Sequence, residues 1–184
     1  MRALIVDGYN IIHALPALKR ALLEHGLQES RRRLIDALAA YAADGDVRVT
    51  VVFDAGARRS GEPTVEVVDG VTVRFGTQRS TADHIIERLA YQASRRGEGI
   101  DLVVATDDRL QRDVVSAMGV ATMRSRALDE ELRRAAAVTE HHAQRLRDQG
   151  RATERLAQRL DPEVARRLEA MRRGRQVPDA GEDA

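Results

Sequence analysis

The segment Ala3-Leu4-Ile5-Val6-Asp7-Gly8-Tyr9-Asn10 decides the fold of this chain. Its apolar residues follow one another without alternation, which predicts a short strand buried on both faces of a sheet. The run stops at Asp7 and Gly8, so an acidic side chain is expected at the carboxyl end of a central strand. In open parallel sheets, ligands bind beyond those ends, near the point where the strand order reverses. Asp7 is therefore the first candidate site residue.

Further acidic residues stand where later elements begin or end: Asp54, Asp83, Asp107 and Asp108. The apolar runs 47–53 and 100–105 predict two more buried strands, each followed closely by an acid. Apolar residues at helical spacing over 80–96 predict a helix, and Asp83 lies near the start of this helix. Because strands joined through helices form parallel crossover units, these acids are expected along one edge of the sheet.

The rest of the pattern completes an α/β domain. Helical spacing and short apolar runs predict helices over 11–25 (with a break near Pro16), 31–43 and 109–118, and strands over 65–68, 71–75 and 120–123. Asp69-Gly70, between two β-branched runs, predicts a hairpin. The order of elements predicts a three-layer α/β sandwich with a mainly parallel central sheet, over about residues 1–126.

The C-terminal region has a different composition. Its apolar residues are too sparse for an independent core, so residues 133–176 are expected to form an Arg-rich helical extension, cut at Gly150 and at Asp161-Pro162. Residues 177–184 are expected to be a disordered tail. The core domain is then predicted over residues 1–132.

Composition limits the classes of function. The 184 residues are 43% hydrophobic and 32% charged, which is typical of one soluble domain with an extension. The chain has no cysteine, which excludes disulfides and thiolate metal sites. No segment approaches membrane-spanning length and the start lacks the pattern of a signal peptide, so a cytoplasmic protein without a membrane partner is expected.

The basic residues are arginines, with Lys19 as the single exception. Arginine makes bidentate contacts with phosphate and stacks on bases, which suits nucleic acid. Candidate RNA contacts begin a helix or flank the predicted acidic edge: Arg31, Arg32, Arg33, Arg79 and Arg109. A coding bias towards arginine and ordinary solvated helix faces are the alternative explanation.

Carboxylates gathered at one edge indicate a hard metal ion. They raise one another's pKa unless a cation lies between them. Mg²⁺ and Mn²⁺ prefer oxygen ligands and keep several waters, and they support hydrolysis of phosphodiesters. Asn10 follows Asp7 by three residues and could orient a water or a phosphate. Each acid also has a structural alternative as a turn residue or helix cap, including a capping box from Ser80 to Asp83.

Four motifs, in order, resemble the YacP-like branch of the NYN domain ribonucleases, relatives of the PIN nucleases. They are Ile5-Val6-Asp7-Gly8-Tyr9-Asn10, Val51-Val52-Phe53-Asp54-Ala55, Thr81-Ala82-Asp83 with Ile86-Glu87, and Val104-Ala105-Thr106-Asp107-Asp108. The similarity spans residues 3–132. It implies a PIN-like, Rossmann-like sandwich and endoribonuclease activity that depends on Mg²⁺ or Mn²⁺. For one branch it also implies cleavage of messenger RNA on the ribosome.

The resemblance implies roles for individual residues. By position, the metal-binding acids and their partners are Asp7, Asp83 and Asp108, with Asn10 and Asp54 completing the site. The family usually has Ser where this chain has Asp107, so Asp107 and Asp108 both remain candidate metal ligands. It commonly has Glu where this chain has Ser80, which leaves the number of metal ions open.

Three functions are consistent with these features. The first is a metal-dependent endoribonuclease acting on single-stranded RNA, including messenger RNA on the ribosome. The second is a non-catalytic module of the same fold that binds RNA or the ribosome. The third is a small-molecule phosphohydrolase that would turn over nucleotides and leave RNA intact.

Overall fold

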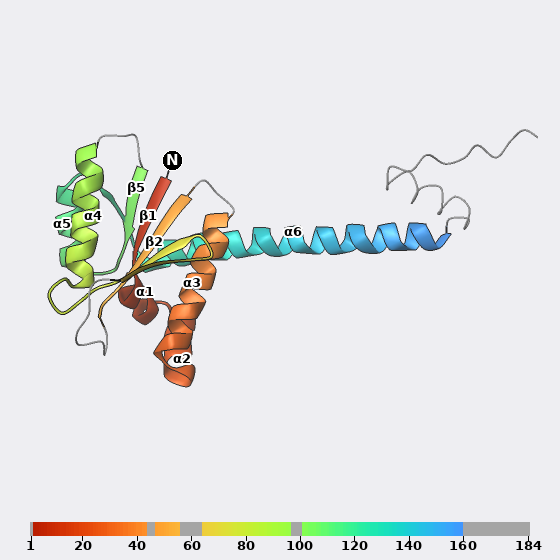
Figure 1. The fold of residues 1–184 in the computed structure, drawn as a ribbon, viewed down its shortest axis with the longest axis horizontal. Helices are drawn as coiled ribbons and strands as arrows, with labels where there is room; N and C mark the ends of the chain where they lie inside the picture. Colours follow the sequence, from red (N-terminus) through yellow and green to blue (C-terminus); the bar gives the residue numbers. More distant parts are fainter. Residues whose placement is uncertain (1, 44–46, 56–63, 97–100, 160–184) are drawn as a thin grey trace, which may run out of the picture. The chain divides into compact units, whose positions relative to one another are not determined.

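The computed structural model describes residues 2–43, 47–55, 64–96 and 101–159 (Figure 1). A six-stranded sheet lies between two layers of helices, as the sequence predicts. Its strands are β1 (Arg2–Asp7), β2 (Val47–Phe53), β3 (Thr64–Val68), β4 (Val71–Phe75), β5 (Asp101–Ala105) and β6 (Ala121–Met123). Among the described residues, no helix is long and apolar enough to cross a membrane.

The strand order is β3-β4-β2-β1-β5-β6, and every neighbouring pair is parallel except β3 with β4. The chain first builds the sheet outwards from β1 through β2 and β4, and then returns to the other side of β1 with β5. The order therefore reverses at β1. This reversal places the carboxyl end of β1, and Asp7 with it, at the point where ligands bind in such sheets.

The helices are α1 (Gly8–Ala14), α2 (Pro16–His25), α3 (Leu27–Ala43), α4 (Ala82–Arg96), α5 (Arg109–Ala117) and α6 (Ser125–Arg159). Figure 1 shows α4 and α5 on one side of the sheet, and α1, α2 and α3 on the other. The first turns of α6 belong to the same side as α3, because their buried leucines share its core. The helices thus form two layers around the sheet.

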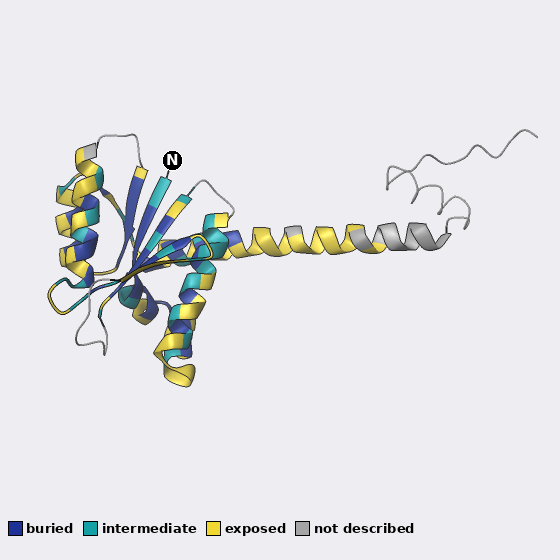
Figure 2. Ribbon diagram, in the orientation of Figure 1, coloured by how far each residue is buried: buried dark blue, intermediate teal, exposed yellow. Residues whose placement is uncertain are grey.

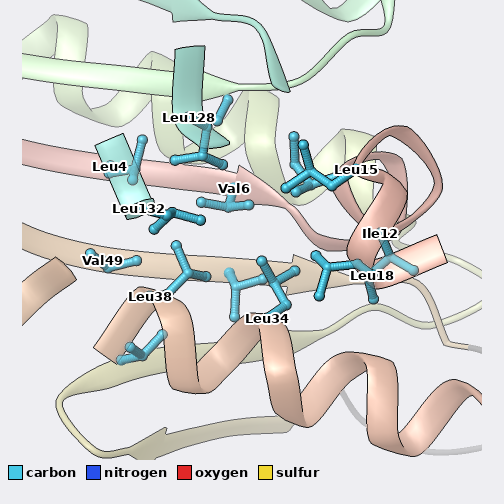
Figure 3. Packing of buried hydrophobic residues seen from close by; sticks show 14 of the residues in the cluster. Leu4, Val6, Ile12, Leu15, Leu18, Leu34, Leu38, Val49, Leu128 and Leu132 are labelled. Atoms are coloured by element: carbon cyan, nitrogen blue, oxygen red, sulfur yellow. The ribbon is translucent and has the colours of Figure 1, made fainter. Parts of the chain in front are cut away.

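Two hydrophobic cores fill the spaces between the layers. Figure 3 shows the larger one, where leucines of α3 and α6 pack beside strand residues Leu4, Val6 and Val49. The smaller core joins Ile85 and Ile86 of α4 to the opposite face of the sheet. The central strands are consequently buried on both faces, as Figure 2 shows and as their unbroken apolar runs predict.

The hairpin at Asp69-Gly70 is confirmed. Both residues have positive φ, 47° and 83°, as a tight hairpin turn between right-twisted strands requires. The break near Pro16 is also confirmed, because Leu15 is extended and separates α1 from α2. Proline then occupies the first position of the new helix, where its missing N–H costs nothing.

Four local predictions are wrong. α1 begins at Gly8, three residues earlier than predicted. α3 begins at Leu27, four residues earlier than predicted, and α6 continues through Gly150 without a break. The capping box from Ser80 does not form, because the hydroxyl of Thr81 accepts the N–H of His84 at 3.4 Å and Asp83 bonds elsewhere. The predicted features at Asp161-Pro162 and over residues 177–184 lie outside the described residues.

The core unit extends to Thr139, and the described residues 140–159 belong to a second unit. In the first unit, α6 buries Leu128, Leu132 and Ala135. In the second, the described side chains are exposed, including Leu146 at 69%. A helix that is polar on all sides relies on something other than burial for its stability.

A charged network lies at the amino ends of the strands. The hydroxyl of Tyr41 donates to Glu131 at 2.5 Å and accepts from Arg2 at 3.4 Å, and Arg2 lies 3.7 Å from Glu131. We call these three residues the amino-end triad. The triad joins β1, α3 and α6, so it ties the first turns of α6 to the domain.

Candidate functional site

Asp7 ends β1 and is only 9% exposed. It is also the N-cap of α1, because its Oδ1 accepts the backbone N–H of Asn10 at 3.2 Å. The acidic side chain therefore satisfies one of the free N–H groups of the helix and remains at the carboxyl edge of the sheet.

Asp54 and Asp83 are brought together by the junction between β2 and α4. Asp54 follows β2, and its Oδ1 accepts the N–H of Ala82 at 2.7 Å, where α4 begins. Asp83 is the second residue of that helix, and its Oδ1 accepts the side-chain amide of Gln111 at 2.6 Å. A strand end and a helix start thus place two carboxylates side by side, although they are 29 positions apart in the chain.

The neighbouring acids Asp107 and Asp108 have different partners. Asp108 is the N-cap of α5 and accepts the N–H of Gln111 at 2.9 Å through Oδ1. Asp107 directs both carboxylate oxygens at Ser125, the first residue of α6: Oδ1 accepts its N–H at 2.9 Å and Oδ2 its hydroxyl at 2.5 Å. Of these two acids, it is Asp108 that adds to the raised pKa of both Asp7 and Asp83, after burial.

Four carboxylates therefore form one group, which we call the acidic cluster: Asp7, Asp54, Asp83 and Asp108. Each uses Oδ1 to accept one hydrogen bond. Within the described part of the chain, no hydrogen bond reaches any of their Oδ2 atoms. These internal hydrogen bonds and ligand binding are thus compatible in this cluster, because the bonds occupy one oxygen of each carboxylate.

The electrostatics of the cluster are unfavourable without a cation. Burial raises the pKa of Asp7 to about 6; Asp83, Asp54 and Asp108 add to this rise, and the hydrogen bond from Asn10 opposes it. The pKa of Asp83 is also raised, first by burial and then by Asp54 and Asp108. Asp107 behaves differently: burial acts to raise its pKa, but the bonds from Ser125 and nearby arginines lower it.

The donor chemistry of the cluster fits Mg²⁺ or Mn²⁺, which prefer carboxylate oxygens. No three acidic or histidine side chains of the described chain are placed so that together they hold one ion. Mg²⁺ does not require three, because it is commonly held by one or two carboxylates and keeps the rest of its shell as water.

Two amide side chains connect the elements of the site. The Oδ1 of Asn10 accepts the N–H of Asp107 at 2.7 Å, so it joins α1 to the loop after β5. Gln111 bridges α4 and α5, and the sequence interpretation missed it. The signal was its position three residues after the cap Asp108, where Glu or Gln commonly acts in capping.

The predicted RNA-contacting arginines occupy varied environments. Arg32 and Arg33 form ion pairs with Glu29 at 2.8 Å, and Arg32 also pairs with Asp36. Arg109 is 87% exposed beside Asp113, and Arg79 is exposed. The structure does not test their binding to RNA, so this role stays a prediction.

Arg31 packs against three aromatic rings next to the strand ends that carry the acids. Its guanidinium carbon is 5.0–5.5 Å from the ring centres of Tyr9, Phe53 and Phe75. Gly8 allows this packing, because a Cβ there would lie 2.2 Å from the Phe53 ring. The cation–π contacts help to fix the strand ends that carry Asp7 and Asp54.

Comparison with known proteins decides the family. The model of the YacP-like NYN domain matches residues 4–173. The chain belongs to the YacP-like NYN domain family. It is 35% identical over 132 residues to the Bacillus subtilis (strain 168) protein named "Uncharacterized protein YacP", an alignment that covers 72% of this chain and 75% of that protein.

Solved structures of this relative have the same fold. The crystal structure of Rae1 (YacP) from Bacillus subtilis matches with a TM-score of 0.69 and 30% identity, over 95% of this chain and 96% of that chain. The crystal structure of a point mutant of the same relative matches with a TM-score of 0.69 and 28% identity, over 93% of this chain and 99% of that chain. The predicted family and fold class are confirmed. Membership of the NYN family is consistent with a nuclease and suggests a role in RNA binding.

Proposed function

We propose that this protein is an endoribonuclease that depends on Mg²⁺ or Mn²⁺ and cleaves phosphodiester bonds of single-stranded RNA. The observation that supports this most directly is the acidic cluster. Four carboxylates, at the ends of β1 and β2 and at the starts of α4 and α5, lie together at the switch point of the sheet, and each keeps one oxygen without a hydrogen-bond donor from the described chain. Family membership points to the same class of reaction.

Asp7, Asp83 and Asp108 are the candidate ligands, with Asp54 beside them, and one or two of these carboxylates together with water would hold the ion. When bound, the metal would supply charge neutralisation at the phosphate and an activated water. Burial first, and then the neighbouring carboxylates, raise the pKa of Asp7 and Asp83. Buried carboxylates beside one another are an arrangement that a divalent ion relieves, which supports this assignment. Asp107 is a weaker candidate, since Ser125 occupies both of its oxygens.

Asn10 has a positioning role in this proposal. Its amide oxygen holds the N–H of Asp107, which fixes the loop that presents Asp108. Its amide nitrogen remains a donor suited to a phosphate oxygen or a water at the same edge.

Substrate contacts and cellular context form the finer part of the proposal. Arg79 and Arg109 flank the acidic edge, where they could bind RNA phosphates, and Arg31, Arg32 and Arg33 lie on α3. The resemblance to one branch of the family implies cleavage of messenger RNA on the ribosome, and we include this activity in the proposal for this chain. A cytoplasmic location accompanies that substrate.

The test is cleavage of a single-stranded RNA and of ribosome-bound messenger RNA by the full chain, with Mn²⁺, with Mg²⁺ and with EDTA. The variants Asp7→Asn and Asp83→Asn should each reduce metal-dependent cleavage by about 1,000-fold or more, because each removes a charge that binds the ion. Circular dichroism should show that both remain folded. Asp101→Asn, an exposed acid at the start of β5, is the matched control.

Full cleavage by both variants would refute the proposal. RNA binding that survives both substitutions, with no cleavage under any metal, would instead identify a non-catalytic binding module. Turnover of nucleotides with RNA left intact would identify a phosphohydrolase.

A further inference from the structure

Gln111 is a buried residue that contacts the acidic cluster. It lies in the first turn of α5 and is 4% exposed. Its backbone N–H donates to Oδ1 of Asp108 at 2.9 Å, and its side-chain Nε2 donates to Oδ1 of Asp83 at 2.6 Å. One residue therefore contacts two of the four carboxylates, through different groups.

The other end of this amide is left without a partner. Oε1 of Gln111 is buried and accepts no hydrogen bond within the described part of the chain. Because Oε1 and Nε2 are bonded to the same carbon, Oε1 lies within a few ångströms of the Asp83 carboxylate. Buried polar atoms in folded proteins nearly always have a partner, often an ordered water. The cluster therefore contains a buried acceptor suited to a water.

We infer that Gln111 is a positioning residue of the metal site: it orients the Asp83 carboxylate against Asp108 and offers Oε1 to a water in the site. This inference rests on the proposed function. The bond from Nε2 occupies Oδ1 of Asp83 and leaves Oδ2 available. The bond from the backbone does the same for Asp108. Gln111 thus sets which oxygen of each acid is free.

The chemistry of the side chain matters as much as its shape. An amide donates a hydrogen bond and carries no charge. It therefore stabilises an ionised carboxylate without taking the place of the metal cation, as a charged donor would. A carboxylate at this position would add a fifth negative charge beside Asp83 and Asp108 and could not donate. A residue that served packing alone would tolerate an apolar side chain of similar length.

The main test compares Gln111→Met with Gln92→Met, an exposed glutamine on α4. RNA cleavage by the full chain is measured over a range of Mn²⁺ concentrations, and Mn²⁺ binding is measured separately by electron paramagnetic resonance of the free ion. Gln111→Met should raise both the Mn²⁺ concentration for half-maximal cleavage and the dissociation constant by about 10-fold or more, as for other residues that orient metal ligands. The KM for RNA should stay near the wild-type value, and Gln92→Met should match the wild type in every measurement.

A second variant, Gln111→Glu, keeps the test decisive if Gln111→Met does not fold. In EDTA its melting temperature should fall below that of the wild type, because the new charge faces Asp83 and Asp108. Mn²⁺ should then raise its melting temperature by more than it raises that of the wild type. An unchanged melting temperature in EDTA would overturn the inference, since Gln111 would not face the carboxylates.

The outcomes separate this inference from the proposed function. Wild-type Mn²⁺ affinity in Gln111→Met overturns the inference, even if Asp7→Asn abolishes cleavage and so supports the proposed function. If the wild type binds Mn²⁺ but cleaves no RNA, the proposed reaction fails and Gln111 is still judged from the binding titration. A wild-type chain that neither binds Mn²⁺ nor cleaves RNA overturns both.

Discussion

The two ends of the sheet both carry charged side chains, but with opposite arrangements. At the amino ends, Glu131 of the amino-end triad has a hydrogen bond from Tyr41 and an ion pair with Arg2. At the carboxyl ends, the acidic cluster places like charges beside one another. The pKa of Asp7 is raised to about 6 by burial above all, and further by its acidic neighbours.

This contrast separates structural charges from charges retained for a ligand. A partly buried acid with a cation and a donor beside it stabilises the folded chain. Acids gathered without a cation lower stability, and proteins keep such arrangements where function requires them. The amino-end triad should therefore affect stability alone, and the acidic cluster should affect activity and stability in opposite directions.

The largest expected effect is on RNA cleavage, and it should distinguish the adjacent residues Asp107 and Asp108. Asp108→Asn should reduce metal-dependent RNA cleavage by about 1,000-fold, whereas Asp107→Asn should retain cleavage within a few-fold of the wild type. The reason is that Asp108 faces the cluster and Asp107 caps α6 through Ser125. Asparagine keeps both residues competent as helix caps, so cleavage rates at saturating Mn²⁺ report on the site and not on folding. Equal losses in the two variants would contradict the assignment.

That pair also shows where prediction from sequence ended. The strand before Asp107 was clear from its apolar run, and so was the presence of an acid at its end. Which of the two acids faces the site depends on Ser125, 18 residues away, because the first N–H of α6 needs an acceptor. Local patterns carry no information about such a contact, and the same holds for the bond from Gln111 to Asp83.

Helix boundaries show the same limit on a smaller scale. Pro16 marked a break correctly, because proline excludes the preceding residue from helical conformation. Gly150 was expected to end a helix, yet glycine in a helix interior costs only about 1 kcal/mol, which favourable neighbours can offset. Strong steric rules therefore predicted structure here, and weak propensities did not.

The second prediction concerns stability without metal. Since the pKa of Asp7 is raised to about 6 in the folded chain, the folded state holds this proton more tightly than the unfolded state. Asp7 therefore lowers stability as pH rises from about 4 to about 6, by about 3 kcal/mol in all, and the loss persists above pH 6. Asp7→Asn should raise the free energy of unfolding in EDTA by about that amount at pH 7.5, and the gain should shrink towards zero at pH 4.

Urea unfolding at several pH values measures this difference. Asp113→Asn, which changes an exposed acid on α5, is the control variant. Saturating Mn²⁺ should narrow the gap between the wild type and Asp7→Asn at pH 7.5, because the ion binds the wild-type cluster more tightly. A gain in stability that was the same at pH 4 and pH 7.5 would show that the charge of Asp7 is not its cause.

The smallest expected effect belongs to the amino-end triad. Tyr41→Phe removes the hydroxyl that donates to Glu131, so the free energy of unfolding should fall by about 1 kcal/mol. Burial, and then Glu131, raise the pKa of Tyr41 to about 12, so the hydroxyl stays protonated and the loss should be equal at pH 6 and pH 9. Tyr91→Phe, on an exposed tyrosine of α4, should have no effect. RNA cleavage should be unchanged in both variants, because the triad lies at the opposite end of the sheet from the acidic cluster; a loss of cleavage in Tyr41→Phe would show that the two ends are coupled.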